Sequence, residues 1–431
     1  MASYAIIGGG LLGMTFAHRF AQLGHEVSLF EADDNLGGLS SPWQINDITW
    51  DKFYHVLLLS DIHIRSLLQE INLDKEIVWK QTKTGFFVDK KFYSMSNSIE
   101  FLKFPFISLI DKFRLGLTIF YASKITNWHK LEEITVESWL RKWSGKNTFE
   151  KVWKPLLKAK LGEEYKNTSA AFIWTTIQRM YAARKGGMKT EMFGYVPGGY
   201  STILKSLKTT LEAENVNIFT NHSAQNISEI HDGVEIKFSN GTVKKFDNTV
   251  ITVPSNIALK ICGSISNETK ESMAKTKYLG VVCASVLLNE KIEDYYVTNI
   301  IDEKIPFTGL INMSALVDEK EFKGKTLIYL PKYVNSNDES FSQTDEELIH
   351  KFKGALLYMF PKLKTENIID IKIAKAKEVF ALPVLNYSKN LSNNNDINSK
   401  ISIINSSHIL NGTLNNNEII KLVNSTIEKL K

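Results

Sequence analysis

Tyr4-Ala5-Ile6-Ile7-Gly8-Gly9-Gly10-Leu11-Leu12-Gly13 begins the stretch, running on to Ser41, that decides the fold of this chain. The apolar run at 4–7 is closed by glycine, which predicts a short buried strand. The glycines after it have the spacing G-x-G-x-x-G. Gly8 permits a tight turn, Gly10 lets the backbone approach a pyrophosphate, and Gly13 lets the next helix pack on the strand. The pattern therefore predicts a strand, turn and helix whose N-terminal amides face phosphate groups.

The residues that follow complete the same unit. An apolar stripe at helical spacing predicts a helix over 12–23, and Gly24 stands where a helix stop belongs. The run 27–30 predicts a second strand, and Glu31 ends it at the place where a carboxylate binds the ribose hydroxyls of an adenine dinucleotide. A turn without a ligand is the alternative, because glycine turns are common. The order of strand, turn, helix, strand and acid within one unit favours the nucleotide site.

A glycine pair, Gly37-Gly38, follows Glu31 after a short spacer. Nicotinamide enzymes do not need such a pair. The combination resembles the flavin-containing amine oxidases, protoporphyrinogen oxidases and phytoene desaturases, in which this loop lies beside the pyrophosphate and ribityl chain. Missing Cβ atoms allow that approach. The resemblance implies FAD as cofactor, bound non-covalently because no His or Cys stands in a flavin-attachment motif. It also implies an α/β fold: a Rossmann-like FAD-binding domain of the glutathione-reductase type with an interleaved α+β substrate domain.

The resemblance also assigns the cofactor contacts. Many relatives carry Ala-Gly-Asp where this chain has Ile404-Asn405-Ser406, so the aspartate that normally meets the cofactor is absent. A residue near Ala224 would present its backbone to the adenine, and the segment 412–414 would offer amides to the flavin or a phosphate. The predicted cofactor-binding residues are Gly8, Gly10, Leu11, Leu12, Gly13, Glu31, Ala32, Gly37, Gly38, Leu39, Ser40, Tyr54, His55, Ala224, Asn405, Ser406, Gly412, Thr413 and Leu414.

A second stretch, Trp153-Lys154-Pro155-Leu156-Leu157-Lys158-Ala159-Lys160-Leu161-Gly162, resembles a segment of bacterial protoporphyrinogen-oxidase-like oxidoreductases. By resemblance, the candidates for contact with the flavin ring or the substrate are His55, Tyr54, Tyr278, Lys160 and Arg184. A core histidine is an equal alternative for His55, and a solvated surface charge is the alternative for the two cations. No catalytic residue is assigned beyond these candidates.

The same resemblance divides the chain into alternating segments. The FAD-binding domain is predicted from residues 1–66, 190–254 and 395–431, and the substrate domain from residues 67–189 and 255–394. Helical patterns dominate the first substrate segment, at 107–125, 136–143, 148–160 and 170–184. Strand patterns in the second segment, at 277–288 and 326–331, predict a mixed sheet. The aromatic run 101–107 is predicted to be a buried loop, with a pocket mouth or a membrane surface as alternatives.

Composition narrows the class of protein. The 431 residues are enough for two or three domains, and the net charge of +5 comes from 52 basic and 47 acidic residues without a dense basic stripe. We therefore expect no nucleic-acid partner. Two cysteines and nine scattered histidines predict neither a disulfide framework nor a metal site. The dinucleotide motif stands within the first residues and no run is long enough to span a membrane, so a cytoplasmic location is expected, with membrane contact at most peripheral. The oligomeric state stays open.

Three functions are compatible with these features. The leading one is an FAD-dependent oxidoreductase that transfers a hydride from an amine or CH–CH unit of a small, apolar or mixed substrate to flavin N5, because the flavin carries the redox chemistry. The first alternative is redox-neutral chemistry resembling UDP-galactopyranose mutase. Paired arginines for a diphosphate do not stand out in the sequence, which disfavours it. The second alternative is a flavin-binding protein with a degraded site.

Overall fold

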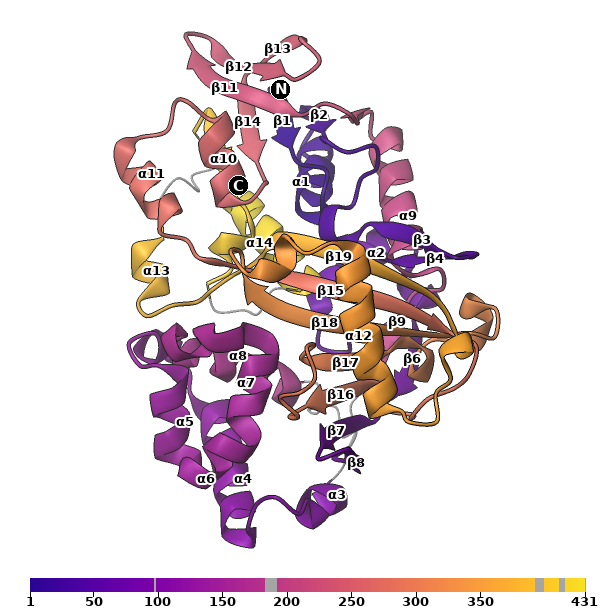
Figure 1. Ribbon diagram of the computed structural model, residues 1–431. Coiled ribbons are helices and arrows are strands. Elements are labelled where there is room, and N and C mark those ends of the chain that lie inside the picture. Colours follow the sequence, from indigo (N-terminus) through magenta and orange to yellow (C-terminus); the bar gives the residue numbers. More distant parts are fainter. Residues whose placement is uncertain (97, 183–191, 392–398, 411–414, 431) are drawn as a thin grey trace.

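The computed structural model describes residues 1–96, 98–182, 192–391, 399–410 and 415–430. Figure 1 shows three tiers: a parallel sheet with its helices at the top, a larger mixed sheet in the middle, and a group of helices at the lower left. Both chain ends lie in the upper tier, so the chain leaves this tier and returns to it.

The upper tier is built on a five-stranded parallel sheet with the order β10-β2-β1-β14-β20. Its strands, in that order, are Asn217–Phe219, Glu26–Phe30, Ser3–Ile7, Asn248–Ile251 and Ile401–Ile403. They come from three distant parts of the chain, one from each segment predicted for the FAD-binding domain. The expected Rossmann-like sheet, interrupted by the rest of the chain, is confirmed.

Alternate side chains of β1 bury the two faces of this sheet. Tyr4 and Ile6 join a core with α1 (Leu11–Gln22), α2 (Ile62–Glu70), α9 (Gly199–Ala213) and α14 (Asn416–Ile427). Ala5 and Ile7 point the other way, into a core with the antiparallel sheet β11–β13 (Ala224–Ile230, Gly233–Phe238, Val243–Phe246). The turn at Asn240-Gly241 joins β12 to β13, and Asn-Gly between two strands is a strong local signal for a hairpin.

Packing bears on two of the domain boundaries, all of which stay predictions. The boundary at 66/67 cuts α2, whose Leu67 and Leu68 lie in the same core as β1. The boundary at 254/255 excludes α10 (Ser255–Ile261) and α11 (Asn267–Ala274), although Ala258 and Met273 pack with Ile251 of the parallel sheet. We therefore propose to extend the FAD-binding segments over α2 and over α10–α11.

The middle tier is a seven-stranded mixed sheet with the order β19-β15-β18-β17-β16-β7-β8. Its strands, in that order, are Ile368–Ala381, Tyr278–Leu288, Thr326–Asn335, Gly309–Asn312, Val297–Ile300, Thr84–Val88 and Lys91–Ser94. Every residue of β15 is buried, because the strand has neighbours on both sides and cores on both faces. One face packs on α12 (Asp345–Met359), and the other on β3 (Pro42–Ile45) and β4 (Ile48–Asp51).

This sheet confirms the expected mixed architecture but corrects one detail. Strands β6 (Val78–Gln81), β7 and β8 lie in a region where helical patterns were predicted to dominate. β6 pairs with β9 (Met192–Tyr195), and β9 also pairs with β5 (Leu57–Leu58). These short strands are fixed by partners far away in the sequence, and local periodicity does not reveal such partners.

The lower tier contains α3 (Ser98–Lys103), α4 (Leu109–Lys124), α5 (Val136–Ser144), α6 (Lys146–Thr148), α7 (Lys154–Leu161) and α8 (Ala170–Ala182). Large side chains fill their common core, including Trp139, Phe149, Trp153 and Trp174. The helix predicted over 148–160 is divided by a π-helical stretch, Phe149–Trp153, before Pro155, which cannot donate a backbone hydrogen bond. The buried loop predicted over 101–107 is only partly confirmed: Phe104 and Ile107 are buried, but residues 101–103 belong to α3 and Leu102 is 55% exposed.

A buried histidine ties three helices of the upper tier together. His18 of α1 is 2% exposed; its Nε2 lies 3.0 Å from Glu70 of α2, and its Nδ1 lies 2.8 Å from Glu214 at the end of α9. Burial lowers the pKa of His18, but the hydrogen bonds to the two carboxylates outweigh burial and raise this pKa above its ordinary value. Burial raises the pKa of Glu70, but hydrogen bonds from His18 and Arg19 outweigh it and lower this pKa to about 2. Near pH 6 the network is therefore charged on both sides.

Replacing His18 by Gln tests this network. The folded pKa of His18 lies above the unfolded one, so its contribution is complete below about pH 6.5 and is lost as the pH rises through the folded pKa. We expect H18Q to lower the free energy of unfolding by about 1.5–3 kcal/mol at pH 6 and by less at pH 9. Urea unfolding at several pH values measures this, and H231Q, at a histidine 97% exposed, is the control. A loss that does not change with pH would contradict it.

Candidate cofactor site

The carboxyl ends of the parallel strands lie along one edge of the sheet. Gly8 follows β1, Glu31 follows β2, Thr252 follows β14 and Ile404 follows β20. In open parallel sheets this edge is where ligands bind. The sequence-predicted glycine loop and acid are thus brought together, as the motif requires.

Each glycine of the loop has a distinct steric reason. A Cβ on Gly13 would lie 1.9 Å from the carbonyl oxygen of Gly8, so α1 can approach β1 only without a side chain there. Gly8 has φ +109°, which favours glycine. A Cβ on Gly10, in contrast, would meet no protein atom within 4 Å. Gly10 is therefore not needed for packing, and the space beside it is free for a ligand.

Glu31 and the second glycine pair close around this loop. Glu31 Oε2 accepts a hydrogen bond of 2.7 Å from the amide of Gly9, and Oε1 accepts one of 2.9 Å from the amide of Asp33. The amide of Gly37 donates to the carbonyl of Gly9 at 2.8 Å. A Cβ on Gly38 would lie 3.3 Å from the Cα of Gly10. Both glycine motifs thus form one continuous backbone surface.

The remaining predicted contacts lie around this surface. Leu11 and Leu12 open α1 and are buried, and the side chain of Ser40 is buried and accepts from Asn416 at 3.3 Å. Ala32 and Leu39 are exposed near Glu31 and Gly38. Ala224 begins β11 on the other core, and Ser406 begins a 3-10 turn after β20. Arg184, Gly412, Thr413 and Leu414 lie outside the described residues, so their predicted roles stay predictions.

The side chain of Asn405 is hydrogen-bonded within the protein. Its amide Nδ2 donates to the carbonyl of Val253 at 2.9 Å, and its Oδ1 accepts from Ser407. The side chain therefore ties β20 to the end of β14. Tyr278 is likewise buried, and its hydroxyl contacts Ser255 at 3.1 Å.

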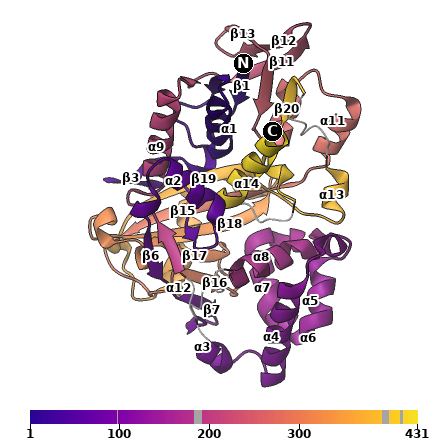
Figure 2. The same cartoon turned by 180° about the vertical axis from the view of Figure 1, so that it is seen from behind.

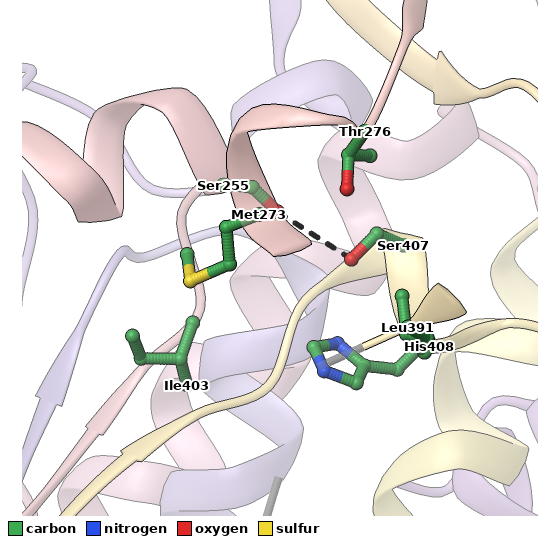
Figure 3. Close-up of a pocket in the computed structure, with 7 residues that line it drawn as sticks. All are labelled: Ser255, Met273, Thr276, Leu391, Ile403, Ser407 and His408. Carbon is green, nitrogen blue, oxygen red and sulfur yellow. Dashed lines mark hydrogen bonds between the residues drawn. The ribbon is translucent and has the colours of Figure 1, made fainter. Parts of the chain in front are cut away.

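Two of the residues hydrogen-bonded to Asn405, Ser255 and Ser407, line a small cavity. Figure 3 shows these two side chains approaching each other across the space between α10 and the turn after β20. His408 points into this cavity, and burial lowers its pKa to about 4. His408 is therefore neutral at physiological pH. The cavity is thus lined by a neutral ring, hydroxyl groups and apolar side chains.

His55, one of the residues predicted to contact the flavin ring or the substrate, lies next to Asp51 and Tyr200. His55 Nδ1 lies 3.7 Å from Asp51 Oδ2, and its ring packs against Tyr200 with a centroid separation of 4.7 Å. Asp51 is buried, and its Oδ1 accepts from the amide of Tyr200 at 2.8 Å. Burial is the largest influence on Asp51 and raises its pKa, although His55 and the Tyr200 amide oppose this. Asp51 and His55 line a small cavity together with Trp50 and Gly199.

Tyr54 and Lys160 also lie close together, and both contact Tyr333. The hydroxyls of Tyr54 and Tyr333 are 2.8 Å apart, and Lys160 Nζ lies 3.2 Å from the Tyr54 hydroxyl. The same ammonium group stands 5.6 Å and 5.2 Å from the two ring centroids. Burial raises the pKa of Tyr54 to about 12, so its hydroxyl stays protonated.

Sequence reasoning missed Gly9, Asp51, Tyr200 and Tyr333. Gly9 stands in a variable position of the motif, yet a Cβ there would lie 2.5 Å from Leu36 and 2.9 Å from Glu31. Asp51 precedes His55 by four residues, but this spacing carries no signal outside a helix. Tyr200 and Tyr333 are distant in sequence, and only the tertiary fold brings them to this site.

The model of the flavin containing amine oxidoreductase family matches residues 13–372 of this chain. The chain belongs to this family. The match confirms the predicted family, and with it FAD as the cofactor and the oxidoreductase class.

Individual relatives of this flavin oxidoreductase are distant. A 15-cis-phytoene desaturase of Solanum lycopersicum is 22% identical over 86% of this chain and 66% of its own length. One from Synechococcus elongatus is 25% identical over 45% of this chain and 44% of its own length. The matches thus span about half to two thirds of these curated relatives. A solved oxidoreductase of Methanosarcina mazei has a TM-score of 0.77 at 16% identity, covering 99% of this chain and 100% of its own. It shares the fold.

The residues at the sheet edge fit FAD. No side chain caps the N-terminus of α1, and no acidic residue lies in its first turn, so the helix end suits a pyrophosphate. The uncrowded side of Gly10 gives the phosphates room, and the carboxylate of Glu31 stands where adenosine hydroxyls are expected.

Replacing Gly10 by Val tests the pyrophosphate position. A Cβ on residue 10 meets no protein atom within 4 Å, so the apoprotein should fold. The valine side chain would instead occupy the space that the phosphates need. We expect FAD affinity to fall at least about 100-fold, roughly 2.7 kcal/mol. Visible absorbance per mole of protein and flavin titration measure this. Gly116→Val is the matched control, because a Cβ there also meets no atom within 4 Å. A Gly10→Val protein as yellow as the wild type would contradict the placement.

Glu31→Ala tests the ribose contact and the loop together. Losing a charged hydrogen bond of about 1.5–3 kcal/mol should weaken FAD binding roughly ten- to a hundred-fold, with no change in flavin reduction once FAD is saturating. Glu31→Gln should lose less, because its amide oxygen can still accept from Gly9. Asp232→Ala, at a side chain 89% exposed, is the control. An unchanged dissociation constant for Glu31→Ala would show that the carboxylate does not face the adenosine.

Proposed function

We propose that this protein oxidises a small organic substrate at an FAD bound along the sheet edge, taking a hydride from a CH–CH unit of an uncharged or anionic molecule. The main observation behind this proposal is a group of four residues beside the glycine surface: Asp51, His55, Tyr54 and Lys160. FAD bound there supplies the hydride acceptor at N5. The protein residues supply position, a proton acceptor and the exclusion of water.

The placement of this group relative to the glycine surface supports the proposal. Tyr200 lies at the start of α9 and receives Asp51 on its amide. One helical turn later, Leu204 lies against Gly37, where a Cβ would be 2.6 Å from its Cδ1. The Asp51–His55 pair is therefore about 6 Å along α9 from the glycine pair. Gly10, Gly37 and Gly38 would hold the middle of a dinucleotide whose adenosine is bound at Glu31, with His55 beyond them.

His55 is the residue we propose as proton acceptor. Oxidation of a CH–CH unit to C=C releases one hydride and one proton, and the proton needs a base. His55 Nδ1 faces Asp51, and this nitrogen is buried and has no hydrogen-bond partner within 3.5 Å among the described residues. A protonated His55 would be stabilised by the Asp51 carboxylate, because burial strengthens the attraction between opposite charges.

The position of Lys160 favours an uncharged or anionic substrate and disfavours a protonated amine. Its ammonium group already stands over the rings of Tyr54 and Tyr333, the faces that would attract a substrate cation. A protonated amine near these rings would meet a like charge.

The redox-neutral alternative has a structural relative but lacks an observation of its own. A UDP-galactopyranose mutase shares the fold, with a TM-score of 0.76 at 16% identity over 100% of this chain and 94% of its own. A diphosphate clamp needs unpaired arginines. Of the described arginines, Arg19, Arg65, Arg141 and Arg179 are bound to carboxylates. Arg114 is exposed on α4, which belongs to the lower tier.

An anaerobic screen of the yellow protein tests the proposal. We expect CH–CH substrates to bleach the visible flavin band and primary amines to leave it unchanged. With the best substrate, His55→Gln should slow flavin reduction about 100-fold or more, without changing FAD affinity. His129→Gln, at a histidine 62% exposed, is the control. Bleaching by amines alone would refute the substrate class, and turnover only after dithionite reduction would establish the redox-neutral alternative.

A further inference from the structure

The lower tier carries an apolar surface that no part of the described chain covers. Five large side chains of α4 are more than half exposed, from 51% at Leu117 to 74% at Ile110; the others are Leu109, Phe113 and Phe120. Leu102 of α3 is 55% exposed beside them. Single exposed apolar residues are ordinary, but a contiguous group of this size marks an interaction surface. We call these six residues the α3–α4 surface.

Helical spacing explains why they form one face. Leu109, Phe113, Leu117 and Phe120 recur every three or four residues, so their side chains lie in one row. Leu115 and Ala122 project from the opposite side of α4 and are buried in the core of the lower tier. Lys112, also buried, donates to the carbonyl of Leu102 at 2.6 Å and fixes α3 against α4. The exposed row is thus held in place and is not a frayed end.

The surface lies at one extremity of the molecule. Figures 1 and 2, taken from opposite sides, both place α3 and the chain leading into α4 at the lower end, farthest from the parallel sheet.

Basic and aromatic side chains surround the apolar row. Four of these cations form no ion pair within the described chain: Lys103, Arg114, Lys124 and Lys142. The ammonium group of Lys124 stands 5.3 Å from the ring centroid of Phe120, and that of Lys142 stands 5.8 Å from the ring of Trp143. Trp143 itself stacks on Tyr121 at 4.1 Å, and both rings are partly exposed. Among the nearby carboxylates, Glu137 and Glu150 bind Arg141, and Asp111 of α4 accepts hydrogen bonds from Ser108 and Asn147.

We propose that the α3–α4 surface binds peripherally to an anionic lipid bilayer. An amphipathic helix with Leu, Ile and Phe on one side and Lys and Arg at its margins lies in the plane of the lipid headgroups. Trp and Tyr prefer the same depth, and the lysine stems can extend along apolar surface while their charges reach the phosphates. Among the described residues, no helix is both long and apolar enough to cross a bilayer, and α4 has 16 residues. The helix therefore rests on the membrane and does not span it.

A second copy of the chain fits this surface less well. A twofold contact would place the same basic margin against itself, and like charges would oppose each other. An anionic bilayer supplies the opposite charge.

Sedimentation with vesicles tests the proposal. The full-length flavoprotein is mixed with phosphatidylcholine vesicles with and without phosphatidylserine. We expect binding to the anionic vesicles that weakens as salt is raised. The double variant Ile110→Glu/Phe113→Glu should bind at least about tenfold more weakly, because it places carboxylates in the apolar row. Val243→Glu, at a residue 51% exposed on β13 at the other end of the molecule, is the matched control.

Two readouts keep the result interpretable. The visible flavin spectrum and thermal unfolding of both variants should match the wild type, since the substituted side chains are exposed. Light scattering without vesicles gives the oligomeric state. A wild type that stays in the supernatant with all vesicles would overturn the proposal, as would equal binding of the double variant. A wild-type dimer that the double variant makes monomeric, without vesicle binding, would identify a second copy as the occupant instead.

Discussion

The close contact between Gly13 and the carbonyl of Gly8 is the constraint on which this structure depends. Only the absence of a side chain at Gly13 allows α1 to start directly over the end of β1. That contact aims the amides of the helix end along the sheet edge. The Gly9 amide then binds Glu31, the Gly9 carbonyl binds Gly37, and a continuous backbone surface forms. A side chain at any of these points would separate the two motifs.

The upper tier holds this surface, and the middle tier completes the site. Side chains of β18 on the face opposite α12 reach the segment that carries Asp51 and His55: the Tyr329 hydroxyl donates to the backbone carbonyl of Asp51, and the Tyr333 hydroxyl contacts Tyr54. The charged and hydroxyl groups of the proposed reaction therefore sit where two sheets meet. Burial there raises the pKa values of Asp51 and Tyr54, because it disfavours their charged forms.

Much of the fold could be predicted because its signals are local. The strand, glycine turn and helix at 4–23, the long strand β15 and the Asn240-Gly241 hairpin are written in short stretches of sequence. The features that local patterns do not show have one physical cause. β6, β7 and β8 have weak patterns of their own and exist because distant strands pair with them, and α10 and α11 join the upper tier through contacts with Ile251 that no local pattern reveals.

The sequence by itself determined the phosphate-facing loop, its acid and the family, because backbone geometry at glycine is a local property. It also supplied His55, Tyr54 and Lys160 as candidates, by resemblance. Only the tertiary structure decided their company: Asp51 beside His55, Tyr333 under Lys160, and Asn405 turned away to tie β20 to β14. It alone decided that one side of α4 stays uncovered. Such pairings depend on which faces meet after packing, and packing joins residues hundreds of positions apart.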